Sequence, residues 1–281
     1  MRFKQITIIG VGLIGGSIGL AVKKRRPASR IIGVTAHKKT LTKAIRRGAI
    51  DKGTLDVRRS VIGSDMVILA TPADKVLSTL EYVALRLKRG CVVTDVASVK
   101  ESIVDSAESI LGDKAFFIGS HPMAGSEQRG IEEAHGDLFK KTPCILTKTN
   151  RTNARAMRAV SDFWRKLGSK VYVLSPGEHD KRVSNISHLP HIVASALSLA
   201  AKPSSLEFAS TGFGDTTRIA SGSPDLWISI LMANRKNVVK DIEDYLYVLI
   251  DIRKTILRSK KSRLRKLLTR AKKKRDTFSL R

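Results

Sequence analysis

Short apolar runs alternate with amphipathic segments along the first 175 residues of the chain. The runs are rich in Ile and Val, and almost every position in them is apolar, which is typical of strands. They cover residues 5–10, 30–35, 65–71, 91–96, 115–120, 143–147 and 170–174. Helical patterns lie between them, for example over 72–90 and 153–168. Nearly continuous apolar strands separated by helices predict a doubly wound α/β fold, with a mostly parallel sheet covered on both faces.

The pattern changes after residue 175, where the strand-like runs end. Helical spacing continues over 177–202, 213–221 and 224–257, and Ser223 followed by Pro224 is a helix start signal. We therefore predict two domains. The first covers residues 1–175 and contains the Rossmann-type sheet, and the second covers residues 176–281 and is entirely helical.

A glycine-rich sequence follows the first predicted strand directly. IIGVGLIGGSIG places Gly10, Gly12 and Gly15 in a G-x-G-x-x-G arrangement between a strand and a helix. The first glycine permits a tight turn, the second lets backbone approach a pyrophosphate, and the third permits close helix–strand packing. The helix N-terminus adds unpaired N–H groups and a partial positive charge. This context predicts a dinucleotide site, and a glycine-rich turn without a ligand is the alternative.

The end of the second predicted strand indicates which dinucleotide binds. Roughly 20 residues after the glycine loop, an NAD enzyme normally has an Asp or Glu that binds the ribose 2′-OH. Here the strand ends in GVTAHKK, so Thr35 takes that place and His37 and Lys38 follow. The missing carboxylate and the added cations favour NADP over NAD. Alternatively, the lysines are part of a general basic excess.

The chain is strongly basic, with 52 Lys and Arg against 25 Asp and Glu and a net charge of +27. Much of the excess lies in 253–275, which contains thirteen Lys or Arg and no acid. A field of this kind attracts polyanions, so a nucleic-acid-binding protein on a Rossmann fold is one hypothesis. The segment contains no aromatic residue to stack on bases, and its apolar residues recur at helical spacing. A solvated helical tail is therefore favoured over a nucleic-acid site.

The two cysteines, Cys91 and Cys144, each lie in an apolar run. They predict buried free thiols in a reducing compartment, and neither a disulfide framework nor a metal site is expected. The basic and apolar N-terminus imitates a signal peptide, but five glycines interrupt it and no small-residue cleavage pattern follows. The apolar run 192–201 is far shorter than the ~20 residues that span a bilayer. We expect a cytoplasmic protein without membrane contact.

The irregular sequence GSHPMAGSEQRG, residues 119–130, follows the strand predicted over 115–120. His121 thus lies near the carboxyl end of the sheet, where open α/β folds bind ligands. A histidine close to a nicotinamide suits a general base for a hydroxyl that is being oxidised. A structural role for a single loop histidine is the alternative.

Several sequences, in order along the chain, resemble motifs of prephenate and arogenate dehydrogenases. They are GVGLIGGSIGLA, TDVASVK (94–100), GSHPMAGSEQRGIEEA (119–134), SHLPHIVASAL (187–197) and STGFGDTTRIASGSPDLW (210–227). The resemblance extends to about residue 250. It implies an NAD(P)-dependent oxidative decarboxylation of prephenate to 4-hydroxyphenylpyruvate, or of arogenate to tyrosine. It also implies a homodimer formed through the helical domain.

The resemblance assigns roles to individual residues. His121 would accept the substrate hydroxyl proton as hydride leaves the same carbon, and Ser98 would lie beside that hydroxyl, although it is also a candidate N-cap. The residues implied to bind substrate are Arg218, Glu127, His191 and Asp215, with Arg218 holding a carboxylate. A surface ion pair between Arg218 and Asp215 is the alternative. His188 and Trp227 are expected to serve structure.

The expected nicotinamide cofactor is NADP, with NAD as the alternative. The residues expected to bind it are Gly10, Gly12, Leu13, Ile14, Gly15, Thr35, His37, Lys38, Thr71, Pro72 and Asp95. Prephenate is favoured as substrate, and arogenate stays open. A β-hydroxyacid dehydrogenase is a further alternative, but such enzymes lack the His-Pro-Met-Ala-Gly loop.

Overall fold

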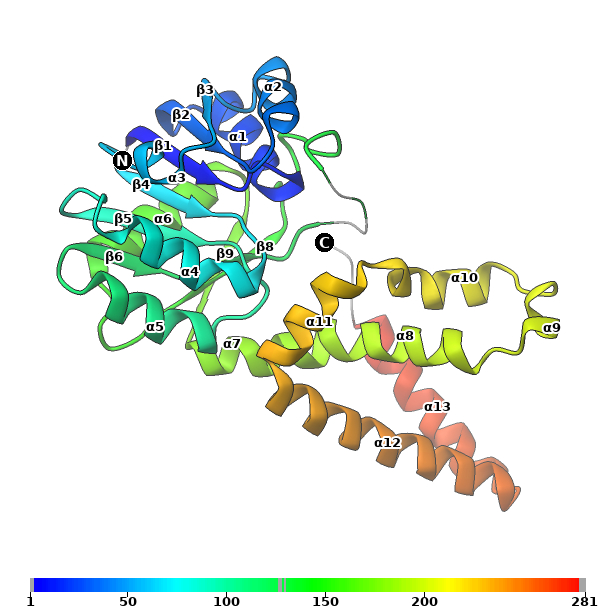
Figure 1. Ribbon diagram of the computed structural model, residues 1–281. Helices are drawn as coiled ribbons and strands as arrows, with labels where there is room; N and C mark the ends of the chain where they lie inside the picture. Colours follow the sequence, from blue (N-terminus) through cyan, green and yellow to red (C-terminus); the bar gives the residue numbers. More distant parts are fainter. Residues whose placement is uncertain (1–2, 126–127, 129, 278–281) are drawn as a thin grey trace. The chain divides into compact units, whose positions relative to one another are not determined.

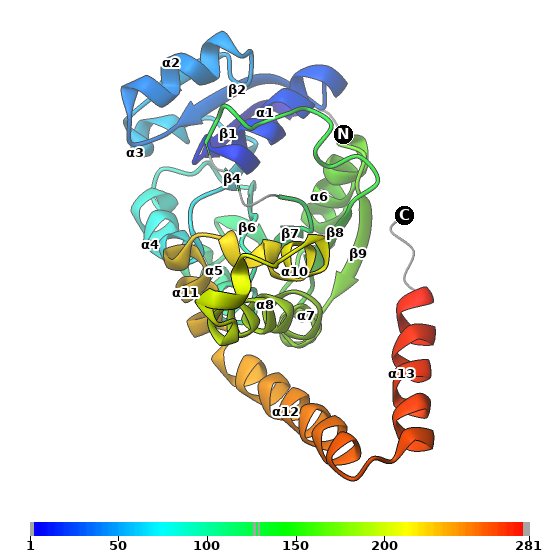
Figure 2. The ribbon, with the colours of Figure 1, turned by 90° about the vertical axis from the view of Figure 1, so that its right-hand side faces the viewer.

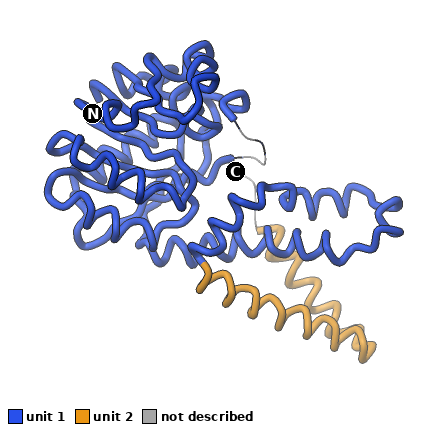
Figure 3. The backbone as a smooth tube through the Cα atoms, in the orientation of Figure 1, with its two compact units in different colours: residues 1–234 blue, residues 235–281 orange. Residues whose placement is uncertain are grey.

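The computed structural model describes residues 3–125, 128 and 130–277 (Figure 1). The chain divides into two compact units, residues 1–234 and residues 235–281 (Figure 3). The predicted boundary at 175/176 coincides with the start of a helix but not with this division. The assignment of separate domains to 1–175 and 176–281 therefore stays a prediction.

The first unit is built on a six-stranded sheet in which every adjacent pair is parallel. Its strands, in spatial order, are β3 (Lys52–Thr54), β2 (Ala28–Val34), β1 (Phe3–Ile9), β4 (Met66–Leu69), β5 (Cys91–Asp95) and β6 (Ala115–Ile118). This order is that of the dinucleotide-binding fold, and it confirms the predicted doubly wound architecture. The connecting helices are α1 (Leu13–Arg25), α2 (Lys38–Arg46), α3 (Val57–Ser60), α4 (Ala73–Ala84) and α5 (Glu101–Leu111).

Apolar residues of the central strands fill both faces of the sheet. In β4, Met66 and Ile68 belong to one core cluster, and Val67 and Leu69 belong to the other. Successive side chains of a strand point to opposite faces, so burial of both faces explains the unbroken apolar runs of the sequence.

The two cysteines are free and buried, as predicted. Burial raises the pKa of the Cys91 thiol to about 12, and burial also raises the pKa of Cys144 well above its ordinary value. Both side chains are therefore neutral packing groups at physiological pH.

Three later strands form a second sheet, which the sequence analysis did not separate from the first. They are β7 (Ser120–Pro122), β8 (Pro143–Thr147) and β9 (Lys170–Leu174), with α6 (Ala154–Lys166) between β8 and β9. β7 is antiparallel to β8, and β8 is parallel to β9. The predicted strand 115–120 is thus split at Gly119, whose carbonyl accepts a hydrogen bond from Thr147 N–H at 2.9 Å. That bond belongs to the second sheet, so the chain changes sheets directly before His121.

The helices that complete the first unit begin at residue 176. They are α7 (Pro176–Val183), the π-helix η1 (Ser184–His188), α8 (Leu189–Ala200), α9 (Pro203–Leu206), α10 (Thr211–Thr217), the 3₁₀-helix η2 (Arg218–Ser221) and α11 (Pro224–Ala233). α8 and α10 lie side by side (Figures 1 and 2). Ser223 caps α11, as predicted, by accepting a hydrogen bond from Leu226 N–H at 3.5 Å.

The second unit consists of α12 (Arg235–Leu257) and α13 (Lys261–Asp276). The single helix predicted over 224–257 is therefore wrong, because the chain breaks at Asn234. The Asn234 side chain is buried and donates to the carbonyl oxygen of Asp180 at 2.8 Å, a long-range bond that overrides the local helical pattern. The basic tail is helical, as expected, and α13, which the structure describes in full, has no buried residue. Within the described part of the chain, no helix is long and apolar enough to cross a bilayer.

Candidate active site

The glycine loop between β1 and α1 has the geometry of a dinucleotide site. Gly10 has a φ of +98°, and a Cβ there would lie 2.4 Å from the carbonyl oxygen of Ala70. A Cβ at Gly15 would lie 2.0 Å from the carbonyl oxygen of Gly10, so this helix start can approach the loop only without a side chain. A Cβ at Gly12 would meet no described atom within 4 Å, and no side chain caps α1 at Gly12. The loop therefore presents open backbone and free helix N–H groups to a pyrophosphate.

The neighbouring strand ends complete this side of the site. Thr71 follows β4, and its Oγ1 is buried without a hydrogen-bond partner among the described residues. Pro72 is the N-cap of α4. Thr35 follows β2 and is half-buried, whereas His37 and Lys38 are exposed at the start of α2. The orphaned hydroxyl and the open loop fit a bound dinucleotide, for which Leu13 and Ile14 would supply the first helical N–H groups.

The histidine loop reaches the glycine loop. A Cβ at Gly125 would lie 3.9 Å from Cδ1 of Ile14, which places the segment after His121 against the start of α1. His121 itself lies in β7 and is 7% exposed. The structure therefore brings the segment that follows the candidate base against the start of the helix that follows the glycine loop.

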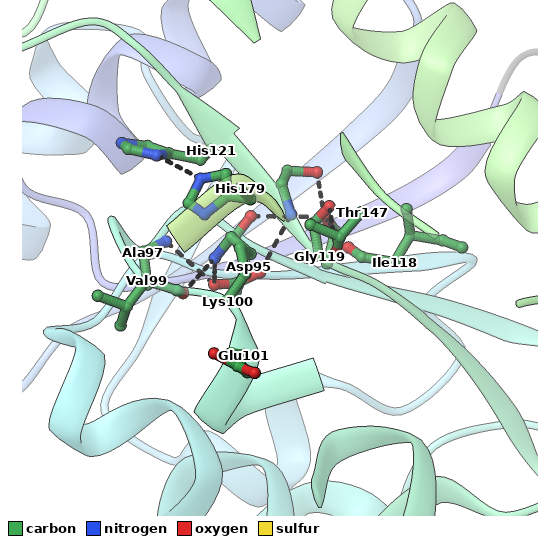
Figure 4. Close-up of polar contacts among 12 residues, drawn as sticks. Asp95, Ala97, Val99, Lys100, Glu101, Ile118, Gly119, His121, Thr147 and His179 are labelled. Atoms are coloured by element: carbon green, nitrogen blue, oxygen red, sulfur yellow. Dashed lines mark hydrogen bonds and ion pairs between the residues drawn. The ribbon is translucent and has the colours of Figure 1, made fainter. Parts of the chain in front are cut away.

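His121 is held by a second histidine that the sequence analysis did not single out (Figure 4). Its Nδ1 lies 2.9 Å from Nε2 of His179, and the two ring centroids are 5.1 Å apart. His179 is fully buried in α7, and its Nδ1 lies 2.7 Å from Oδ1 of Asp180. The three side chains form a continuous hydrogen-bonded row that ends at a carboxylate.

Asp180 is fixed from several directions. Its Oδ1 accepts the backbone N–H of Lys100 at 2.8 Å, and its Oδ2 accepts that of Glu101 at 2.9 Å. These are the first N–H groups of α5, so Asp180 caps that helix from a distant part of the chain. Ser98 is not the cap: α5 begins at Glu101, and no side chain of its own N-cap residue supplies the bond.

A buried ion pair frames the loop between β5 and α5. Lys100 and Asp95 are both fully buried, and Nζ of Lys100 pairs with Oδ2 of Asp95 (Figure 4). The carboxylate also accepts the backbone N–H groups of Ala97 and Ser120, each at 3.1 Å. The Asp95 carboxylate is buried and paired with Lys100, and the predicted role of Asp95 in cofactor binding stays a prediction.

The protonation of the histidines follows from their burial. Burial lowers the pKa of His121 well below its ordinary value of 6.5, and the neighbouring His179, Lys100 and His188 act in the same direction. Burial also lowers the pKa of His179, although the Asp180 carboxylate opposes that effect. Both rings are therefore neutral at pH 7, and His121 is in the form that accepts a proton.

The histidine predicted to contact substrate, His191, lies in α8 and is stacked on Trp227. The two rings are 3.6 Å apart and inclined by 10°. Burial lowers the pKa of His191, and its Nδ1 is buried without a hydrogen-bond partner among the described residues. Trp227 packs against the core cluster of β4 and β5, which agrees with its expected structural role.

The remaining predicted residues are placed as follows. Ser98 is half-buried in the β5–α5 loop, two residues before Lys100. Arg218 opens η2 and is exposed, and Asp215 is exposed in α10. Glu127 lies outside the described residues. The placement of these side chains around a substrate stays a prediction.

Sequence reasoning missed His179, Asp180 and Lys100. His179 and Asp180 lie just after residue 175, where the pattern changes from strand-like runs to helical spacing. The signal that could have indicated them is an adjacent His-Asp pair in the first turns of a helix that starts with Ser-Pro. The contact between His179 and His121 spans 58 residues, and no local pattern predicts it.

Proteins of known structure are similar to this chain over almost its whole length. The crystal structure of prephenate dehydrogenase from Aquifex aeolicus, in complex with hydroxyphenyl propionate and NAD+, is 31% identical and superposes with a TM-score of 0.93 over 99% of both chains. Synechocystis arogenate dehydrogenase is 32% identical, with a TM-score of 0.85 over 98% of this chain and 100% of that one. Prephenate dehydrogenase of Bacillus subtilis (strain 168) is 35% identical over 283 residues, 98% of this chain and 76% of the relative.

The strand order, the open glycine loop and the buried histidine of the loop that reaches Ile14 are those of a dehydrogenase that uses a nicotinamide dinucleotide. The family model of the prephenate dehydrogenase nucleotide-binding domain matches residues 18–173, and that of the prephenate dehydrogenase dimerization domain matches residues 175–270. The chain belongs to the prephenate dehydrogenase family, which confirms the resemblance found in the sequence.

Proposed function

We propose that the protein oxidatively decarboxylates prephenate to 4-hydroxyphenylpyruvate, with His121 as the general base. The observation that carries this proposal is the buried, neutral imidazole of His121, which His179 holds by a hydrogen bond, in a loop whose Gly125 approaches Ile14 of the dinucleotide loop. A bound nicotinamide supplies the hydride acceptor. His121 takes the proton of the substrate hydroxyl, and Ser98 orients that hydroxyl. Loss of carbon dioxide then makes the ring aromatic, which drives the reaction forward.

Arogenate is the second candidate substrate, because the chain is 32% identical to an arogenate dehydrogenase over nearly its whole length. The two substrates differ by a keto group in place of an ammonium group on the side chain. Steady-state kinetics with both substrates, each with NADP and NAD, decides between them. Absence of turnover with both substrates would refute the proposed function. Nucleic-acid binding that weakens steeply with salt would instead support the alternative of a polyanion-binding protein.

We propose NADP as the preferred cofactor, since Thr35 follows β2 and the exposed His37 and Lys38 come next. The variant Thr35→Asp would place a carboxylate where the 2′-phosphate binds. We expect the ratio of kcat/KM for NADP to that for NAD to fall by roughly 10- to 100-fold, since a hydrogen bond to a charged group contributes about 1.5–3 kcal/mol. Lys170→Glu, which makes a larger change of charge at an exposed position of β9, is the control and should leave the ratio unchanged. An unchanged ratio in Thr35→Asp would refute the NADP assignment.

We propose that Arg218 binds a carboxylate of the substrate. Arg218→Ala should raise the KM for prephenate by roughly 10- to 100-fold while kcat changes little, because the guanidinium holds the substrate and does not enter the chemical step. Arg218→Lys should recover part of the affinity, since lysine keeps the charge but not the bidentate geometry. Initial-rate kinetics of both variants measure this. A fall in kcat at constant KM would contradict the assigned role.

We also propose a homodimer formed through the helical part of the chain. The second unit exposes a consecutive run of apolar side chains on α12, and the family model that matches 175–270 is described as a dimerization domain. The exposed apolar residues of that run are Leu246, Tyr247, Val248, Leu249 and Ile250. Apolar surface of this extent needs a cover in water. Light scattering of the purified protein measures the mass of the particle and so tests the dimer.

We also propose a cytoplasmic location, which the two buried free thiols support.

A further inference from the structure

We propose that Asp180, acting through His179, fixes the tautomer of His121 so that its Nε2 is the unprotonated nitrogen. The proposal rests on the assigned role of His121 as the base and adds two positioning residues to it. Neither residue needs to touch the substrate. Their effect is exerted through the row of hydrogen bonds that joins Asp180, His179 and His121.

The direction of each hydrogen bond follows from its partners. An ionised carboxylate can only accept hydrogen bonds, and Asp180 already accepts two backbone N–H groups at the start of α5. Nδ1 of His179 must therefore carry the hydrogen that it donates to Asp180. In a neutral ring the other nitrogen is then an acceptor, so Nε2 of His179 accepts from Nδ1–H of His121. This leaves Nε2 of His121 with a lone pair.

The row is rigid enough to hold this arrangement. His179 lies in α7, whose start is capped by Ser175, which accepts the backbone N–H of Glu178 at 3.2 Å. Asn234 donates to the backbone carbonyl of Asp180 at 2.8 Å. His179 and Asp180 are excluded from solvent, so water cannot exchange the donors and acceptors. Because burial keeps both rings neutral at pH 7, the tautomer decides whether His121 can accept a proton.

Asp180→Asn tests the direction of the row. The side-chain oxygen of the asparagine can still accept a hydrogen bond from a backbone N–H of α5. Its NH₂ group would donate to Nδ1 of His179, and this would reverse the tautomers of His179 and His121. We expect kcat to fall by roughly 10²- to 10⁴-fold with KM unchanged, because a wrong tautomer in a Ser-His-Asp triad costs about 10⁴-fold. Imidazole ¹⁵N NMR should show His121 protonated at Nδ1 in the wild type and at Nε2 in Asp180→Asn. His121→Asn identifies the His121 signals among those of the six histidines.

Two further comparisons separate positioning from stability. Asn153→Ala removes a cap that accepts two backbone N–H groups of α6, each at 3.0 Å, and should lower Tm without lowering kcat. His179→Gln keeps an acceptor for Nδ1–H of His121 and should retain at least tenfold more turnover than His179→Leu, which fills similar space without one. If Asp180→Asn does not fold, the comparison of His179→Gln with His179→Leu decides whether His179 positions His121.

The proposal is overturned if His121 of the wild type is protonated at Nε2. It is also overturned if Asp180→Asn leaves the tautomer unchanged, or if His179→Leu is as active as His179→Gln. The NMR measurement does not depend on turnover. A wild type that is inactive on prephenate and arogenate but shows Nδ1–H at His121 would therefore refute the proposed function and leave this inference standing.

Discussion

Replacing His121 with asparagine is expected to lower kcat by roughly 10²- to 10⁴-fold, while KM for the substrate changes little. The magnitude is that of a lost general base, whose proton transfer occurs in the transition state and not in substrate binding. Asparagine keeps a nitrogen donor near the position of Nδ1, so the hydrogen bond to His179 can persist and the fold should be retained. Steady-state kinetics with prephenate and a saturating dinucleotide measure the effect.

The pH dependence gives a second test of the same assignment. The pKa of His121 lies well below 6.5, so the base is fully available at neutral pH and is lost only as the pH falls through that lowered value. The acid limb of kcat/KM should therefore lie well below pH 6.5 in the wild type.

The control for His121→Asn is His135→Asn, which changes an exposed histidine and should leave kcat unchanged. A fully active His121→Asn enzyme would refute the role assigned to His121.

The architecture of the sheet was largely predictable from the sequence. A strand that is buried on both faces is apolar at nearly every position, so it appears as a continuous apolar run. The strand β3 was missed, since Lys52–Thr54 is short and contains no apolar run. The second sheet was missed because apolar runs do not record which sheet a strand joins. The break at Asn234 was missed because helical spacing continues across it, and the bond that causes the break reaches residue 180.

The candidate site was predictable where its chemistry is local. The glycine loop is a contiguous pattern with its own geometry, and the structure shows the turn, the open position and the close approach that it predicts. The partners of His121 were not predictable, because His121 lies in β7 and His179 lies in α7, 58 residues later. Asp95 shows what local reasoning leaves out. Its place at a strand end indicates a ligand-binding carboxylate, and no sequence pattern indicates that the buried Lys100, five residues later, pairs with it.

Lys100→Met is expected to destabilise the protein by about 3–5 kcal/mol. Methionine has a similar length, but it leaves the Asp95 carboxylate fully buried without a cation, and such a group costs far more than the loss of the pair itself. The carboxylate keeps its bonds from the backbone N–H groups of Ala97 and Ser120, which do not neutralise its charge. Denaturant unfolding monitored by fluorescence gives the free energy of unfolding of wild type and variant.

The matched control is Lys88→Met, which removes the cation from the pair with Asp65, directly before β4. Those side chains are 42% and 23% exposed, so water solvates the remaining carboxylate and the expected loss is below about 1 kcal/mol. In the double variant Asp95→Asn/Lys100→Met, the uncompensated charge is absent while the amide oxygen still accepts a backbone N–H. It should therefore be more stable than Lys100→Met alone. Equal losses in Lys100→Met and Lys88→Met would show that the Asp95 carboxylate is not sealed from water as its burial indicates.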